Sequence, residues 1–382
     1  MELILSDQQR LLSESAEKFF KRLGGAKRAR ALRNSEAGFD PACLREMGAA
    51  GWLGMLVPEL HGGLELGPCE LALILQQAGR ALGPEPLGAA ALAALTISES
   101  DNDTARHSLL PPAMSGDAII MPALQEDSSS LGLSDPSTRA ERTKGGWRLN
   151  GAKDFVVAAA ASTGFLVSAR GPDGLVICHV PRGAQGLDIA LQPAVDGRSY
   201  GRLTLDAVQP DHMLIGPNLA EAALERHHDF ALLAAAAELL GVMEGASELT
   251  LEYLKIRKQF GRAIGSFQAL QHRAVDNYVL IESTRSFLYQ TCERGAPLSS
   301  SIVSALKSYA SGAALTVTKS AIQLHGAIGF TDEYDAGLYL KRAMWLSAHL
   351  GNEAAHRRRY GILAATHAAP LDNGDAARGG SA

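Results

Sequence analysis

The fold of this chain is decided by the stretch IRKQFGRAIGSFQ, residues 256–268. It ends one strongly helical segment, breaks it at two glycines and starts another helix. Gly261 lets the chain turn without steric cost. Arg257 and Lys258 are cations at the end of the first helix, where the helix dipole favours positive charge. Taken alone, they fit either that structural role or the binding of an anion such as phosphate.

Helical patterns lie on both sides of this break and at the N-terminus. Ser6 and Gln9 have the spacing of a capping box, which predicts a helix through Phe20. Apolar periodicity predicts long helices further on, over residues 230–258, 267–294 and 299–325. Four or five long helices with short connections favour a helical bundle.

The middle of the chain has a different texture. From about residue 118 it consists of short apolar runs separated by Gly, Pro, Asp and Ser, as in residues 146–151 and 174–181. Such runs predict the strands of a small antiparallel barrel.

Composition limits the class of function. The chain has 382 residues, 46% of them hydrophobic, and a formal net charge of -5, so it can bury a large core divided into two or three domains. It has no long basic block, which argues against nucleic acid as a main partner. The apolar runs at 87–95 and 230–240 are shorter than the roughly 20 residues of a membrane span. Because the N-terminus lacks the profile of a secretory signal, we expect a cytoplasmic protein.

Cysteine spacing gives no sign of a metal. The four cysteines, at positions 43, 69, 178 and 292, are scattered with no CxxC pair. We therefore predict neither a metal site nor a disulfide framework.

The stretch at 256–268 resembles the flavin-binding signature of the FAD-dependent acyl-CoA dehydrogenase family. A second stretch, QLHGAIGF at 323–330, resembles that family's other cofactor motif at a family-like distance downstream. The two together are much more specific than either alone. The glycine-rich turn VPELHGGL at 57–64 is similar to the family's Pro-Glu-x-x-Gly-Gly loop. The resemblance covers nearly the whole chain, to about Leu363.

The resemblance implies an α+β fold of three domains. These are an all-α N-terminal domain over 1–117, a middle antiparallel β-barrel domain over 118–216 and a C-terminal four-helix bundle over 217–365. The tail at 366–382 has too little apolar surface to pack, and we expect it to be disordered. In this family a tetramer holds FAD between the middle and C-terminal domains of one subunit and the bundle of a neighbour, so the oligomer is part of the site.

The two flavin motifs supply one set of expected FAD contacts. Arg257 offers a fork of donors suited to pyrophosphate oxygens, and Phe260 can cover the adenine side of the cofactor. By resemblance, Gln268, Gln323 and Gly326 line the adenosine and pyrophosphate path, partly across the subunit boundary.

The middle domain departs from the family pattern. The family's Thr-Glu-Pro-x-Ala-Gly-Ser-Asp loop aligns with residues 125–132, where only Glu126 matches. In the next motif Phe155 keeps an aromatic ring where a Trp packs by the flavin, while Val157 loses a hydroxyl that would bond its reactive edge. One lost hydrogen bond costs roughly 0.5–1.5 kcal/mol, which weakens or retunes FAD binding. Gln125, Phe155 and Val157 are the expected flavin contacts of this domain.

The catalytic base is missing from both of its family positions. Dehydrogenation of an acyl-CoA removes an α-proton while a hydride leaves the β-carbon for the flavin, so a carboxylate must lie within about 3 Å of that proton. Most members carry it as the Glu of a Tyr-Glu-Gly-Thr motif, which aligns with residues 349–352, HLGN. A minority carry it at the position of Ala231. Neither Leu350 nor Ala231 can accept a proton.

Other titratable groups near these positions are weak replacements. Glu353 looks like the start of a helix, where an acidic side chain meets the positive end of the dipole. Asp229 reads as a first-turn or cap residue, and Glu238 as paired or at an interface. His349 is the best titratable group beside the missing base, although a His there is more often structural. His325 is expected to pack against the end of the cofactor.

We therefore expect a role in α,β-dehydrogenation of an acyl-CoA, with three explanations for the missing base. The chain can be one subunit of a heteromeric dehydrogenase, as occurs in bacteria for bulky thioesters such as steroid side chains, whose related partner supplies the base. It can be a non-catalytic scaffold for assembly or regulation. It can also be a homomeric enzyme with a relocated base such as Glu353 or His349. By resemblance, the electron acceptor is an electron-transferring flavoprotein.

Overall fold

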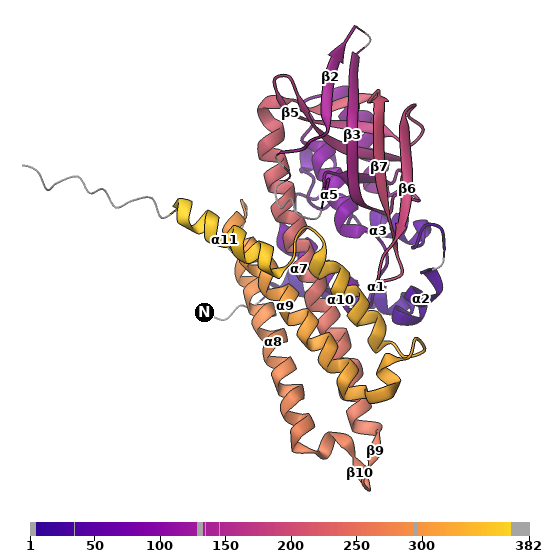
Figure 1. Ribbon diagram of the computed structural model, residues 1–382, viewed down its shortest axis with the longest axis vertical. Helices are drawn as coiled ribbons and strands as arrows, with labels where there is room; N and C mark the ends of the chain where they lie inside the picture. Colours follow the sequence, from indigo (N-terminus) through magenta and orange to yellow (C-terminus); the bar gives the residue numbers. More distant parts are fainter. Residues whose placement is uncertain are drawn as a thin grey trace, which may run out of the picture.

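The computed structural model describes residues 5–33, 35–127, 133, 135–144, 146–293 and 297–367. Within them the chain is helical up to Ser115, forms strands from Ile120 to Ile215 and is helical again from Pro217. The sheet and the N-terminal helices lie together at one end, and long helices extend away from them (Figure 1). This arrangement confirms the expected fold class. The domain limits stay a prediction, and residues 368–382 of the tail lie outside the described residues.

The N-terminal part begins with the predicted capping box. Ser6 Oγ accepts a hydrogen bond from Gln9 N at 3.1 Å, and Gln9 Oε1 accepts one from Ser6 N at 3.0 Å. The glycine-rich stretch at 57–64 forms the predicted turn between helices, because Gly62 takes a φ of 83°. The helices of this part are α1 (Asp7–Leu23), α2 (Gly25–Leu32), α3 (Pro41–Ala49), α4 (Pro68–Arg80), α5 (Leu87–Ser98) and α6 (Asp103–Ser115), with a 3-10 turn at Glu59–His61.

The strands form one sheet in the order β6-β7-β3-β2-β4-β5-β8, with β1 beside β4. Most neighbours are antiparallel, as expected, but β1 and β2 both run parallel to β4. The strands β4 and β5 are buried at nearly every position, which places them at the centre of the domain. The bounds are β1 (Ile120–Ala123), β2 (Arg139–Thr143), β3 (Gly146–Val157), β4 (Gly164–Gly171), β5 (Gly174–Pro181), β6 (Leu187–Pro193), β7 (Ser199–Val208) and β8 (His212–Ile215).

The C-terminal part is a bundle in which α9 packs against α7, α8, α10 and α11. The stretch at 256–268 forms the predicted break: α7 ends at Ile256, a two-stranded hairpin follows, and α8 begins at Gln268. The elements are α7 (Pro217–Ile256), β9 (Lys258–Gln259), β10 (Arg262–Ala263), α8 (Gln268–Glu293), α9 (Ser300–His325), α10 (Ala336–Ala348) and α11 (Glu353–His367), with 3-10 turns at Ile264–Ser266 and Gly326–Phe330.

The central helix α7 is buried on most sides. Among the described residues it is long and apolar enough to cross a membrane, yet 78% of its most apolar 18-residue window is buried inside the protein. Core helices of bundles have this same length and composition. Contacts with α4, α9, α10 and β5 occupy its apolar surface.

Helices α4 and α7 touch through their backbones at two glycines. A Cβ atom on Gly241 would lie 1.8 Å from the carbonyl oxygen of Gln76, and one on Gly79 would lie 2.2 Å from that of Glu238. Real side-chain atoms never approach so closely, so only glycine permits this crossing. The crossing fixes the distance between the two helices beside the cavity described below.

Replacing Gly241 by Ala should force α4 and α7 apart. Because the clash is with backbone, we expect a loss of about 1–3 kcal/mol, the usual effect of overpacking, measured by urea denaturation followed by circular dichroism. The matched control is Gly337→Ala in α10, where an added Cβ meets nothing within 4 Å; it should be neutral or stabilising by up to about 1 kcal/mol. Equal stability of the two variants would contradict the close crossing.

Candidate functional site

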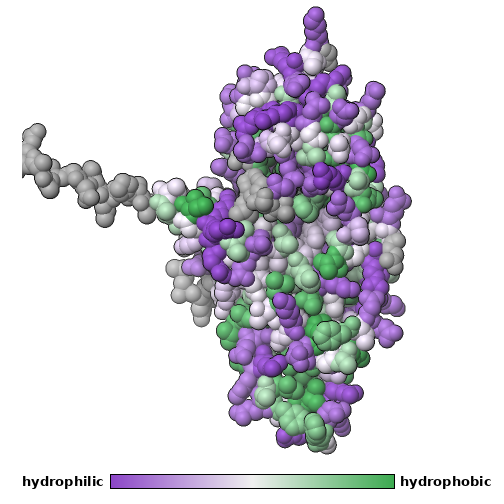
Figure 2. Space-filling model, viewed as in Figure 1, coloured by the Kyte–Doolittle hydropathy of each residue, from purple (hydrophilic) through white to green (hydrophobic). Residues whose placement is uncertain are grey.

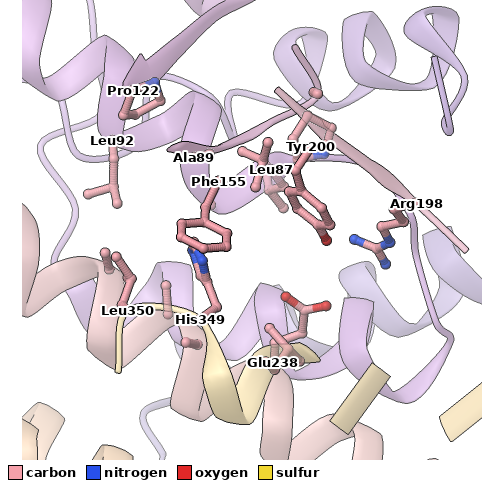
Figure 3. Close-up of a pocket in the computed structure, with 18 of the residues that line it drawn as sticks. Leu87, Ala89, Leu92, Pro122, Phe155, Arg198, Tyr200, Glu238, His349 and Leu350 are labelled. Carbon is pink, nitrogen blue, oxygen red and sulfur yellow. The ribbon is translucent and has the colours of Figure 1, made fainter. Parts of the chain in front are cut away.

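A large cavity lies where the three parts of the chain meet. Its empty space is about 1350 Å³, part of it open to solvent. Figure 3 shows Leu92 and Leu350 toward one side and Arg198, Tyr200 and Glu238 toward the other, so the cavity has an apolar side and a polar side. The apolar wall includes Leu75, Leu87, Leu92, Leu124, Leu346 and Leu350, and the polar wall includes Glu85, Asp154, Arg198, Glu238, Arg342 and His349.

One face of α7 forms the floor of this cavity. Residues 227, 231, 234, 235 and 238 all line it, and their spacing of three and four places them on one side of a helix. Ala231, one of the two aligned base positions, therefore lies in the wall. Three of the five are alanines, which leave the floor wide.

The turn after α10 carries the other aligned base position. Leu350 lines the cavity, and its φ is 59°, a left-handed conformation that a leucine rarely adopts. His349 also lines the cavity and stacks on Trp345, with ring centroids 4.3 Å apart. Burial, Lys307 and Arg342 together lower the pKa of His349 to about 3. The imidazole is therefore neutral at physiological pH and is a weak proton acceptor.

Arg342 joins the bundle to the sheet at the polar side. It is 5% exposed, and its guanidinium lies 2.8 Å from Asp196 Oδ2 and 2.6 Å from Glu238 Oε1. Burial opposes the charge of this guanidinium, but Glu238 and Asp196 outweigh it and raise its pKa. Burial would likewise raise the pKa of Asp196, yet Arg198 and Arg342 hold it below its usual value.

The same network reaches the N-terminal part. Arg198 donates a hydrogen bond to the carbonyl of Gly83 at 3.0 Å, just beyond α4. Trp345 lies under Arg342 at 4.7 Å and stacks on Tyr200 of β7 at 4.5 Å. One buried cluster thus ties together the N-terminal helices, the sheet and the bundle around the cavity.

The carboxylates in the cavity wall are all ion-paired. Glu238 pairs with Arg342, as expected from its apolar surroundings, and Glu85 pairs with Arg28 at 2.5 Å. Asp154 lies 3.2 Å from an Arg202 nitrogen. Each of these three carboxylates is therefore already engaged by a guanidinium group.

Two of the replacement bases considered from the sequence, Glu353 and Asp229, do not line the cavity. Glu353 begins α11, as expected, and forms an ion pair with Arg357 while lying against Gly312 of α9. Asp229 accepts a hydrogen bond from Ser300. Of those candidates, only His349 and Glu238 face the cavity.

Three expected flavin contacts from the middle domain come together in the cavity wall. Gln125, Phe155 and Val157 all line it. Phe155 has a φ of 57°, a second strained position beside the cavity. Gln125 Oε1 is buried and has no hydrogen-bond partner among the described residues, so it can accept a bond from a ligand. Most of the loop after it, residues 128–132, lies outside the described residues.

The five expected contacts from the flavin motifs lie at the opposite end of the bundle. Arg257 is 19 residues from Glu238 along one helix, a distance of roughly 28 Å at 1.5 Å per residue. Its neighbour Phe260 is 90% exposed at the tip of the hairpin. Gln268, Gln323 and Gly326 are also exposed. One chain does not bring the two groups of residues together.

His325 is buried within the second motif. Its ring packs between Tyr253 and Tyr334, with centroids at 4.6 and 4.7 Å, and its Nδ1 lies 2.7 Å from the carbonyl oxygen of Ala321. Its expected packing against a cofactor stays a prediction.

Apolar side chains are exposed around this end of the bundle. Figure 2 shows hydrophobic side chains gathered over the lower half of the molecule, where this end of the bundle lies. The most exposed large ones there are Ile256 (73%), Phe260 (90%), Val275 (57%), Tyr278 (60%), Val279 (54%) and Phe330 (80%). Exposed apolar patches of this kind mark surfaces that other chains cover.

Sequence reasoning missed several residues of the cavity. Glu85, Asp154, His227 and Arg342 line it. Asp154 stands at a variable position of the middle-domain motif that contains Phe155, and the other three belong to no recognised motif. For two residues of α7 the sequence does hold a signal of the cavity wall. His227 and Glu238 fall on the same helical face as Ala231, an aligned base position.

Replacing Arg342 by Leu should leave Glu238 without its guanidinium partner and Asp196 with Arg198 as its one remaining guanidinium among the described residues. We expect a loss of about 3–5 kcal/mol at pH 7, the usual effect of breaking a buried pair. Because the folded pKa of Asp196 is lowered, its contribution is present above its ordinary value of 3.8 and is lost as the pH falls through the lower folded value. The difference between the variant and the parent should therefore shrink below about pH 4.

The control for that experiment is Lys341→Leu. Lys341 is the preceding residue, is 42% exposed and lies 3.6 Å from Asp332. Surface pairs of this kind contribute about 0–1 kcal/mol. Denaturant unfolding at pH 7 and pH 3 measures both variants. Equal losses for the two variants, or a difference for Arg342→Leu that is independent of pH, would contradict the buried network.

Comparison with known proteins identifies the family. The model of the acyl-CoA dehydrogenase N-terminal domain matches residues 6–117, and that of the acyl-CoA dehydrogenase C-terminal domain matches residues 223–361. The acyl-CoA dehydrogenase IpdE2 of Mycobacterium tuberculosis is 30% identical over 341 residues, which cover 88% of this chain and 91% of that protein.

Solved structures give the same result. A variant of the Tcur3481-Tcur3483 steroid ACAD is 36% identical with a TM-score of 0.86 and covers 95% of this chain and 99% of its own. The ChsE4-ChsE5 complex from Mycobacterium tuberculosis is 26% identical with a TM-score of 0.86 and covers 96% and 99%. With the helix, sheet and bundle order seen here, these matches show that the chain belongs to the acyl-CoA dehydrogenase family.

Proposed function

We propose that this chain is one subunit of a heteromeric FAD-dependent acyl-CoA dehydrogenase whose partner supplies the catalytic base. The observation that carries the proposal is the cavity wall. Both aligned base positions, Leu350 and Ala231, lie in it with side chains that cannot accept a proton, and the carboxylates in the same wall are ion-paired.

The residues present fit FAD in two places. At the cavity, Phe155 offers an aromatic face, and buried Gln125 Oε1 offers an acceptor without a partner among the described residues. At the far end of the bundle, Arg257 offers an exposed cation for a pyrophosphate and Phe260 an exposed ring. When bound, FAD accepts the hydride from the substrate's β-carbon. Because one chain keeps the two places far apart, each FAD would need two subunits.

The apolar side of the cavity suits the acyl part of a thioester. Leucines line it, and the alanines of α7 leave its floor wide. Two of the similar solved structures are a steroid ACAD and the ChsE4-ChsE5 complex, which supports a bulky acyl group such as a steroid side chain. The electron-transferring flavoprotein as acceptor and the cytoplasmic location stay predictions.

A homologous second chain is the partner that we propose. The names of both similar structures pair two components. The exposed apolar side chains around residues 256–279 and 330 provide a surface for such a partner. The same surface carries Arg257 and Phe260, so covering it would complete an FAD site.

The chain purified alone should show little turnover of common fatty acyl-CoAs with an artificial electron acceptor, and turnover should appear when a homologous partner is coexpressed. Robust turnover by the isolated chain that is lost in Glu353→Gln but kept in Glu333→Gln, an exposed control, would contradict dependence on a partner and would support a relocated base. No turnover in either preparation would favour a non-catalytic scaffold.

Replacing Arg257 by Ala should reduce the flavin content of the complex. Loss of a charge-assisted hydrogen bond of about 1.5–3 kcal/mol weakens binding roughly 10- to 100-fold, which can be measured as the ratio of flavin to protein absorbance after dialysis. The control is Lys255→Ala, because Lys255 pairs with Glu252 on its own helix at 2.9 Å. An unchanged ratio for Arg257→Ala would show that this side chain does not hold the pyrophosphate.

A further inference from the structure

A lysine lies fully buried beneath the cavity. Lys307 of α9 is 0% exposed, and no carboxylate of the described residues lies within ion-pair distance of it. Its Nζ instead donates to Ser311 Oγ at 3.2 Å, to the carbonyl of Gly351 at 3.1 Å and to that of Ser347 at 3.4 Å. A buried cation without a counter-ion is costly, so its position calls for an explanation.

Two of these acceptors belong to the end of α10 and the turn after it. Ser347 lies in the last turn of the helix, where carbonyls lack helical partners. Gly351 closes the turn that contains Leu350. Lys307 therefore satisfies carbonyls on both sides of the cavity-lining residues His349 and Leu350.

A second buried side chain, His356, contacts the carbonyl of Leu350. His356 of α11 is 0% exposed, and its Nε2 lies 2.8 Å from the carbonyl oxygen of Leu350. Because a carbonyl only accepts, Nε2 must carry the proton. His356 Nδ1 is buried without a partner among the described residues. This ring is therefore a neutral donor aimed at the turn.

The turn itself is strained. Leu350 has a φ of 59° and Gly351 a φ of 106°. Glycine adopts such values freely, but a leucine does so only where its surroundings impose the conformation. The two buried donors contact the carbonyls of these same two residues, so they are the groups that can impose it.

We propose that Lys307 and His356 are positioning residues that hold the turn 349–351 in its left-handed conformation and so set the cavity wall at Leu350. Neither side chain lines the cavity, so each acts through the turn. The proposal concerns the shape of the wall and stands whether or not the chain is a dehydrogenase.

The proposal can be tested by changing the pH, because Lys307 titrates in a range where the neighbouring histidines do not. Burial lowers the pKa of Lys307 to about 7. Burial and nearby cations lower the pKa of His228 and His349 to about 3 and that of His356 to about 4, so all three are neutral above pH 5. The titratable groups on which the charge of Lys307 acts are His228 on α7, His349 after α10 and His356 on α11. The charged groups next to these are Asp229 on α7, Arg342 in the middle of α10, and Glu353 and Arg359 on α11.

Deprotonation of Lys307 should loosen the turn. The ammonium has three N–H donors, and the neutral amine has two and a lone pair, so Lys307 then donates two hydrogen bonds instead of three. The remaining two also lose their charge assistance. Lys307 loses its proton as the pH rises through about 7. The ammonium should therefore hold the turn 349–351 below about pH 7, and the neutral amine should hold it more weakly above that pH.

Trp345 is a natural reporter, because it stacks on His349 with an interplanar angle of 21°. In a Trp52→Phe, Trp147→Phe background its fluorescence can be followed from about pH 5.5 to pH 9. We expect an emission transition centred near pH 7 that is lost in Lys307→Met. Lys319→Met, an exposed lysine on the same helix, should keep it. A transition that persists in Lys307→Met, or no transition in the parent, would overturn the proposal.

A second pair of variants keeps the test decisive if Lys307→Met fails to fold. His356→Gln retains an N–H donor for the Leu350 carbonyl, and His356→Leu removes it. The emission of Trp345 should shift in His356→Leu and stay near that of the parent in His356→Gln. Identical emission in the parent and in His356→Leu, both folded by circular dichroism, would overturn the role of His356.

Leu350→Gly tests the link to backbone strain. Glycine removes the steric cost of a positive φ, so Leu350→Gly should recover part of the fall in Tm caused by His356→Leu. In the parent, where His356 already holds the conformation, Leu350→Gly should change the Tm by a different amount. Additive changes in Tm would show that the donor and the strained turn are uncoupled and would overturn the proposal.

Discussion

Arg342 carries a buried positive charge on which the rest of the cavity depends. Its guanidinium lies between Asp196, in the loop that joins β6 to β7, and Glu238 of α7. Arg198 of that loop donates a hydrogen bond to the carbonyl of Gly83. Because a buried guanidinium is stable only when it is paired, Arg342 keeps Asp196 and Glu238, and with them the sheet and the bundle, in this relative position. The ion pairs thus fix the cavity and at the same time occupy a carboxylate, Glu238, that faces it.

The cavity is therefore well formed but has no free carboxylate in its described wall. Its wall contains three strained residues, Phe155, Ala158 and Leu350, where the surroundings override residue preference. The polar side is internally neutralised, and the apolar side is wide. For the proposed dehydrogenation, such a site would bind and orient a flat ring and an acyl group and would take its proton acceptor from a partner. Under the proposed function, the distant and exposed Arg257 end of the bundle is the surface that a second subunit covers.

Local signals allowed the prediction of much of the fold. The capping box at Ser6 and the glycine break between Ile256 and Gln268 depend on neighbouring residues, so the sequence predicts them. The left-handed Leu350 could not be predicted, because leucine disfavours that conformation and the groups contacting its turn come from α9 and α11. Nor could the pairing of Glu85 and Asp154 with arginines beside one cavity, since it arises from tertiary packing.

The most direct test is the visible absorption spectrum of the bound flavin before and after anaerobic addition of an acyl-CoA. It should be recorded for the chain alone and for the chain with a homologous partner, and it needs no external electron acceptor. We predict that the flavin bleaches only when the partner is present, because proton removal requires the partner's base. Bleaching in the chain alone would contradict the central claim, since it would require a base within this chain.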